Sequence, residues 1–282
     1  MKILNRNNSL DSLRGVAVLL VIFFHLEKFL VTDVYFFNGG YLGVDIFFVI
    51  SGYILTKQII FERINNNYID LQNFIFRRIR RLLPTLLIML IISSIIIYVF
   101  FSKNSANEFY KTIFYTIFFI YNIKLMTFPA DEGYHQISSD PFLHTWSLGA
   151  EFQIYIFFFI FIIVCYNFYK SVYFRINFIF FIIIISFLLC LFFHNFSSNI
   201  NFYSPITRSW EFFFGSLIAY KEENIKIVSN KILINLLSLF SILLILFFTK
   251  TLNSNSFHPG FLTIFPVLST GILIITLQNQ VN

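Results

Sequence analysis

Two ionisable residues in the first apolar stretch of the chain have types and spacing suited to proton transfer. Arg14 and His25 stand eleven residues apart. In an α-helix this spacing leaves them about 20° from eclipsed and about 16 Å apart along the axis, so they share one face. An imidazole titrates near neutrality, which makes His25 a candidate general base with the cation of Arg14 on the same side.

A carboxylate in the second apolar stretch is the expected partner of His25. Asp45 lies about five residues after the start of that stretch, just as His25 lies about five residues before the end of the first. Antiparallel helices would bring the two side chains to similar depth, where a carboxylate fixes the tautomer of an imidazole and raises its pKa. Ser51 and Gly52, further along, are small enough to allow close approach of another helix.

Polar residues at helical spacing recur in two later apolar stretches. His144, Ser147 and Glu151 stand at i, i+3 and i+7, which predicts one polar stripe on an apolar helix. Arg208 stands three residues before Glu211, so a helix would pair the two and lower the cost of burying both. Because ionisable groups in membrane helices are costly, three such stripes in one small protein indicate function.

Each of these residues also has a structural interpretation. Trp146 and Trp210, beside the two stripes, are equally typical of aromatic anchors at the membrane interface. Glu151 could be a hydrogen-bond partner in helix packing. The remaining histidines stand in predicted loops or at helix ends and are expected to be solvated: His135, His194 and His258.

The densest positive charge is a run of four arginines, Arg77, Arg78, Arg80 and Arg81. Guanidinium groups bind phosphates through charge-assisted and sometimes bidentate hydrogen bonds. Taken alone, the run is also typical of a cytoplasmic flank of a membrane helix, and it is expected to precede a helix that begins near residue 82. It predicts that this end of the helix, and the N-terminus with it, lies in the cytoplasm.

The composition shows which elements must position these residues. The chain is 57% hydrophobic and 12% charged, with a mean hydropathy of +0.77, too apolar for a soluble domain. Apolar runs of roughly 20 residues predict an all-α polytopic bundle of about nine transmembrane helices. Their expected spans are 13–31, 40–61, 82–101, 109–127, 143–166, 175–194, 207–221, 232–249 and 260–278. The spans 109–127 and 207–221 are the weakest of these.

The charge and the cysteines exclude several partners. The net charge of +6 lies mostly in short flanks of apolar runs, so a lipid bilayer is expected as partner and nucleic acid is not. Cys165 and Cys190 stand inside apolar runs with no Cys or His at ligand spacing, so neither a disulfide nor a metal is expected.

The order of these motifs resembles that of the acyltransferase family 3 membrane proteins, the O-acyltransferases of bacterial surface carbohydrates. The resemblance covers nearly the whole chain. Its motifs, in order, are Leu10-Asp11-Ser12-Leu13-Arg14-Gly15 with His25, Gly43-Val44-Asp45-Ile46-Phe47-Phe48-Val49-Ile50-Ser51-Gly52-Tyr53, the arginine run closed by Pro84, His144-Thr145-Trp146-Ser147-Leu148 with Glu151 and Gln153, and Arg208-Ser209-Trp210-Glu211 with Gly215.

The resemblance implies transfer of an acyl group, usually acetyl from cytoplasmic acetyl-CoA as co-substrate, to a hydroxyl of a carbohydrate or glycolipid at the bacterial inner membrane. His25 matches the family's essential histidine and Arg14 its accompanying arginine, and we add Asp45 and Glu151 to the catalytic set. The family's acyl-CoA element, R-x-x-R, is either Arg78 with Arg81, which stands nearer Pro84, or Arg77 with Arg80. Substrate contact or structural support is expected of Ser51, His144, Trp146, Ser147, Arg208, Trp210 and Glu211.

The chain departs from the family pattern in two places. Glu151 is followed by Phe152 where the family has a second acid. The chain stops at Asn282 before the family's tenth helix and before the extracytoplasmic domain that many relatives append, so we expect residues 1–282 to be one acyltransferase domain truncated at its C-terminus. Two alternatives remain: a transporter or channel that uses the intramembrane charges, and an inactive membrane fragment.

Overall fold

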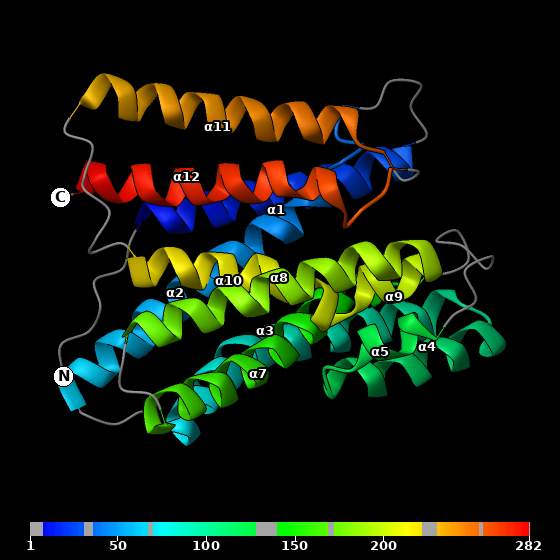
Figure 1. Ribbon diagram of the computed structural model, residues 1–282. Helices are drawn as coiled ribbons and strands as arrows, with labels where there is room; N and C mark the ends of the chain where they lie inside the picture. Colours follow the sequence, from blue (N-terminus) through cyan, green and yellow to red (C-terminus); the bar gives the residue numbers. More distant parts are fainter. Residues whose placement is uncertain are drawn as a thin grey trace. The chain divides into compact units, whose positions relative to one another are not determined.

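The computed structural model is built of helices throughout the part of the chain that it describes (Figure 1). That part comprises residues 8–30, 36–66, 70–127, 140–168, 172–221, 230–253 and 256–281. Seven of the helices in these ranges are long and apolar enough to cross a membrane, by length and composition. The expected all-α polytopic architecture is therefore confirmed, and the chain is a multi-pass membrane protein.

Large apolar side chains on the outer sides of these helices are exposed. Exposure of so much contiguous apolar surface requires a hydrocarbon solvent, because in water it would drive association. The exposed residues follow one side of α3 (Leu71–Phe100) and of α11 (Lys231–Thr251), and they include Ile88, Ile92, Ile95, Val99, Leu236, Phe240, Leu243 and Phe247. These two helices therefore present broad lipid-facing surfaces.

The helices form two compact units. The first contains residues up to 65, 171–196 and 206–282, and the second contains residues 66–170 and 197–205. The first unit consists of α1 (Asn8–Leu30), α2 (Leu42–Asn66), α8 (Val172–Phe196), α10 (Pro205–Lys221), α11, the short 3-10 helix η3 (Phe261–Thr263) and α12 (Ile264–Val281). Helices α11 and α12 lie side by side in Figure 1, and α1 contacts α12.

Two glycines allow α2 and α10 of the first unit to cross at very short range. A Cβ atom added at Gly52 would lie 1.8 Å from the carbonyl oxygen of Phe212, and one added at Gly215 would lie 1.9 Å from that of Val49. One turn away, the hydroxyl of Thr56 donates to that of Ser216 at 2.8 Å. The close helix approach expected from Gly52 is therefore present, and its partner is α10.

We expect Gly52→Ala and Gly215→Ala each to destabilise the first unit, because neither carbonyl can yield without separating the two helices. Overpacking of this kind costs about 1–3 kcal/mol or more, and it should lower the apparent melting temperature in detergent. Gly15→Ala is the matched control, since a Cβ at Gly15 has nothing within 4 Å. Equal melting temperatures for all three variants would contradict the proposed crossing.

The second unit consists of α3, α4 (Lys103–Ile117), α5 (Tyr121–Met126), η1 (Leu143–Thr145), α7 (Trp146–Phe168) and α9 (Ser198–Tyr203). A reciprocal pair of side-chain amides holds three of these helices together. Asn122 and Gln153 exchange hydrogen bonds of 3.1 and 2.9 Å, and Asn122 also donates to the carbonyl of Tyr203 at 3.2 Å. These bonds fasten α5 to α7 and α9 inside an otherwise apolar core.

Three features of the second unit differ from the sequence prediction. The span expected at 109–127 is broken, because Phe119 has a φ of 56° and separates α4 from α5. Helix α9 was not expected. The arginine run lies inside α3, which begins at Leu71 instead of near residue 82, because arginine is a good helix former and the carboxylate of Asp70 caps the helix by accepting from the backbone N–H of Asn73. This contact lowers the pKa of Asp70.

Candidate active site

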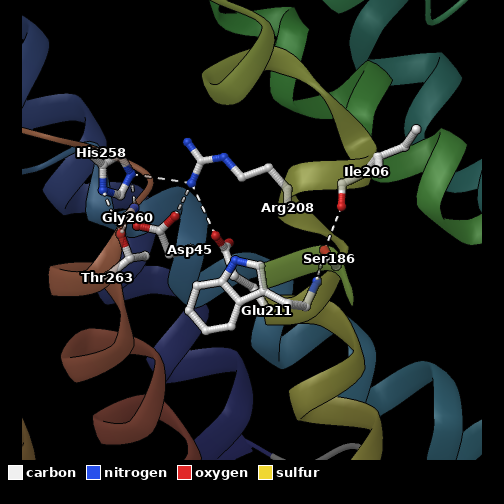
Figure 2. A network of polar contacts seen from close by, with 9 residues as sticks. Asp45, Ser186, Ile206, Arg208, Glu211, His258, Gly260 and Thr263 are labelled. Atoms are coloured by element: carbon white, nitrogen blue, oxygen red, sulfur yellow. Dashed lines mark hydrogen bonds and ion pairs between the residues drawn. The ribbon is translucent and has the colours of Figure 1, made fainter. Parts of the chain in front are cut away.

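Four ionisable side chains meet inside the first unit and are almost completely enclosed. The guanidinium of Arg208 forms ion pairs with Asp45 and with Glu211, the latter at 3.3 Å (Figure 2). The Nε2 atom of His258 lies 3.3 Å from the other carboxylate oxygen of Asp45 and 3.3 Å from Nη1 of Arg208. The four side chains are at most 3% exposed. We call Asp45, Arg208, Glu211 and His258 the charged cluster.

The starts of two helices and one connecting segment bring the charged cluster together. Asp45 stands in the first turn of α2, and Arg208 and Glu211 stand near the start of α10. His258 comes from the connection between α11 and α12, where its Nδ1 atom lies 3.2 Å from the hydroxyl of Thr263 in η3. Because the backbone N–H of Gly260 donates to the same hydroxyl at 3.0 Å, the connection is fixed over the ends of α2 and α10.

The predicted pair of Arg208 and Glu211 is thus present, and Asp45 has an imidazole beside it. That imidazole belongs to His258, whereas the sequence suggested His25; contact between Asp45 and His25 stays a prediction. The expectation that His258 is solvated is wrong, because the chain folds the α11–α12 connection into the unit. Burial lowers the pKa of His258, the neighbouring Asp45 raises it, and Arg208 adds a smaller lowering effect.

A hydroxyl from α8 fixes the start of α10. Ser186 donates to the carbonyl of Ile206 at 2.5 Å and accepts from the backbone N–H of Trp210 at 2.9 Å (Figure 2). These two backbone groups stand at i and i+4, one helical turn apart, so the hydroxyl bridges them. Arg208 stands between them in sequence. The sequence alone contains no signal for this role of Ser186.

We expect Ser186→Ala to destabilise the start of α10 because the carbonyl of Ile206 and the buried backbone N–H of Trp210 lose the hydroxyl that bridges them. The cost should be about 1–3 kcal/mol, measured as a lower apparent melting temperature in detergent. Ser238→Ala is the matched control, since that hydroxyl donates only to the carbonyl of Ile234 in its own helix. If both variants melt at the same temperature, Ser186 does not support α10.

The first-helix residues lie on α1 of the same unit. Arg14 is 16% exposed, and its Nη1 atom lies 3.9 Å from the carboxylate of Asp11. His25 is half-buried, and its ring centroid lies 4.9 Å from that of Phe24. Phe24 in turn lies 5.5 Å from Tyr41, whose ring lies 4.5 Å from that of His258. A row of four rings therefore leads from His25 to the charged cluster.

The remaining predicted residues lie in the second unit, except for Ser51 and Trp210, which are buried in the first. His144 is exposed and belongs to η1, so it does not continue the polar face of α7. The hydroxyl of Ser147 donates to the carbonyl of His144 at 3.2 Å. Glu151 is half-buried on α7 and accepts a hydrogen bond from Tyr155. Of the four arginines on α3, Arg78 is buried and the other three are exposed.

Neither tryptophan is an interfacial anchor, so that alternative is wrong for both. Trp146 is 7% exposed, and its ring packs against those of Phe202 and Tyr203, at centroid distances of 4.8 and 5.2 Å. Trp210 is 4% exposed and packs edge-on against Phe187 at 5.1 Å. His135, expected in a loop, lies outside the described residues. Within the described ranges, no group of three His, Cys, Asp or Glu side chains is placed to hold a metal ion.

Comparison with known proteins places the chain among acyltransferases. The sequence profile of the family described as "Acyltransferase domain" matches residues 7–282. An uncharacterized protein of Haemophilus influenzae is 34% identical over 254 residues, which cover 84% of this chain and all of that protein. The O-acetyltransferase OatA of Staphylococcus aureus is 34% identical over 149 residues, 53% of this chain and 23% of the relative. This chain thus matches about a quarter of the length of OatA, and no solved structure matches it.

Proposed function

Because the chain belongs to the acyltransferase family whose profile matches residues 7–282, we propose that it transfers an acyl group, acetyl in the first instance, from acyl-CoA to a hydroxyl of a cell-envelope carbohydrate. The observation that carries the proposal is this match over nearly the whole chain. The name of OatA, an O-acetyltransferase, supports acetyl as the group transferred to an oxygen.

His25 is the proposed general base. It removes the proton of the acceptor hydroxyl, whose oxygen attacks the thioester carbonyl, and collapse of the tetrahedral adduct breaks the C–S bond and releases CoA, whose thiolate takes up the proton. The half-buried position of His25 suits this role, because the side chain is partly accessible while its ring contacts that of Phe24. Arg14, about 16 Å from His25 along the same helix, is too far away to share the reacting carbon, so its proposed role is to contact the acyl donor.

The charged cluster supports the site without contacting substrate, since its side chains are enclosed. Asp45, Arg208 and His258 tie α2, α10 and the α11–α12 connection together. The rings of Tyr41 and Phe24 pack between His258 and His25, and in this way they position His25 relative to the charged cluster. In this proposal Asp45 is a positioning residue, in place of the direct contact with His25 suggested by the sequence.

The donor is proposed to bind on the cytoplasmic side, where the arginines of α3 meet the phosphates of CoA. The run of positive charge favours a cytoplasmic location for that end of α3, and for the N-terminus, in a bacterial inner membrane. The test uses membranes that contain the full chain, supplied with acetyl-CoA labelled in the acetyl group. We expect label in the envelope glycan fraction, and the absence of label above that of membranes without the protein would refute the proposal.

A further inference from the structure

The four arginines of α3 do not share one environment, although they stand within five residues of each other. Arg78 is 7% exposed, whereas Arg77, Arg80 and Arg81 are exposed. The guanidinium carbon of Arg78 lies 5.7 Å from the ring centroid of Phe74, one turn earlier on the same helix. Phe74 is itself 1% exposed, so the Arg78 side chain follows the inner side of α3.

The contacts between α3 and α7 establish what lies opposite Arg78. The rings of Phe74 and Phe159 lie 5.1 Å apart. Further along α3, Leu82 and Leu86 share one apolar cluster with Phe152 and Leu148 of α7. Residue numbers rise along α3 as they fall along α7, so the two helices are antiparallel in this register. One turn after Phe74 on α3 is Arg78, and one turn before Phe159 on α7 is Tyr155.

Tyr155 and Glu151 form a hydrogen-bonded pair at this level of α7. The Tyr155 hydroxyl, on a side chain that is 7% exposed, donates to the carboxylate of Glu151 one turn earlier. Electrostatic interactions link both groups to the cation of Arg78. A buried guanidinium needs such a counter-charge, because an isolated cation inside a membrane protein is costly.

Resting on the proposed function, we infer that Tyr155 and Glu151 hold Arg78 inside the second unit as a positioning residue, so that Arg77, Arg80 and Arg81 are the arginines available to the donor phosphates. This division assigns a role to Tyr155, which no motif singled out. It also makes Glu151 a positioning residue instead of a catalytic one, and it separates Arg78 from Arg81 within the R-x-x-R element.

A double-variant cycle in the full chain tests the inference. The first cycle contains Arg78→Gln, Glu151→Gln and the double variant. The comparison cycle contains Arg77→Gln, Glu151→Gln and their double variant. The readouts are the KM for acetyl-CoA, the kcat, and the apparent melting temperature in detergent. We expect Arg78→Gln and Glu151→Gln each to raise KM about 3- to 10-fold with a smaller change in kcat, and the double variant to be no worse than the more harmful single variant.

In the comparison cycle we expect the effects of Arg77→Gln and Glu151→Gln on KM to multiply, because Arg77 is exposed whereas the inferred partner of Glu151 is the buried Arg78. Arg78→Lys should recover part of the loss by keeping the charge, and Tyr155→Phe should resemble Glu151→Gln. Multiplying effects in both cycles would overturn the inference. If the wild-type chain transfers no acyl group, the proposed function is wrong. The pairing of Arg78 with Glu151 is then tested by the melting temperatures alone, and additive shifts for Arg78→Gln and Glu151→Gln would overturn it.

Discussion

Replacing His25 with alanine is expected to lower acyl transfer about 100- to 10,000-fold, the range that a positioned general base contributes. The physical reason is that the acceptor hydroxyl would then have to lose its proton to water while it attacks the thioester. The measurement is transfer of label from acetyl-CoA in membranes, at matched levels of inserted protein. The apparent melting temperature should change little, because His25 is only half-buried.

His194→Gln is the matched control for the histidine chemistry. His194 is another half-buried imidazole of the first unit, on α8, and its ring packs against Phe257 at 4.2 Å. It has no role in the proposed site, so this variant should retain transfer. Transfer by His25→Ala at the level of the wild-type chain would remove His25 from the mechanism while leaving the family membership intact.

Seven of the nine expected membrane spans match helices that are long and apolar enough to cross a membrane, among the described residues, because hydropathy identifies such segments. The expected spans 109–127 and 207–221 are not among them. The expected span 175–194 became α8 at Val172–Phe196, and 232–249 became α11 at Lys231–Thr251. The break at Phe119 could not be predicted in the same way, because the stretch 109–127 was expected as a single span, although a weak one, and hydropathy does not locate an interruption within it. Its interruption depends on Asn122 and Gln153, whose amides find each other only in the folded second unit.

The site could be predicted only where its residues lie close in sequence. Arg208 and Glu211 stand three residues apart, so helical periodicity was sufficient to pair them. Asp45 and His258 stand more than two hundred residues apart, and the surroundings of His258 resemble an ordinary loop. Its burial follows from the packing of α11 against α12, which carries the connection over α2. The spacing of residues along the sequence does not predict that packing.

The arginine run illustrates a different limit. Its composition indicates a cytoplasmic flank and a phosphate site equally well, and the four side chains are chemically identical. What distinguishes Arg78 is the α7 face that packs against α3, with Phe159 and Tyr155 at successive turns. Periodicity identified Glu151 as polar on an apolar helix, but the partner of a buried charge depends on the register between two helices.

The second large prediction concerns the ion pair of Arg208 and Asp45 in the charged cluster: Arg208→Gln should destabilise the protein more than Asp45→Asn does. Arg208→Gln leaves Asp45 and Glu211 as two enclosed carboxylates without their shared cation, and breaking a buried pair in this way costs about 3–5 kcal/mol. Asp45→Asn removes one carboxylate, but Arg208 keeps its pair with Glu211 at 3.3 Å, so the cost should be nearer about 1–3 kcal/mol. The measurement is the shift of the apparent melting temperature in detergent.

The combined variant Asp45→Asn with Arg208→Gln makes this prediction specific to the pair. Once Asp45 carries no charge, removal of the guanidinium leaves one carboxylate, Glu211, in place of two, so the double variant should be more stable than Arg208→Gln alone. Simple addition of the two losses would mean that the residues act independently. Because a row of rings through Tyr41 and Phe24 links the charged cluster to His25, Asp45→Asn should act on His25 indirectly and lower acyl transfer less than His25→Ala does. An equal loss would instead place Asp45 in direct contact with the reacting groups.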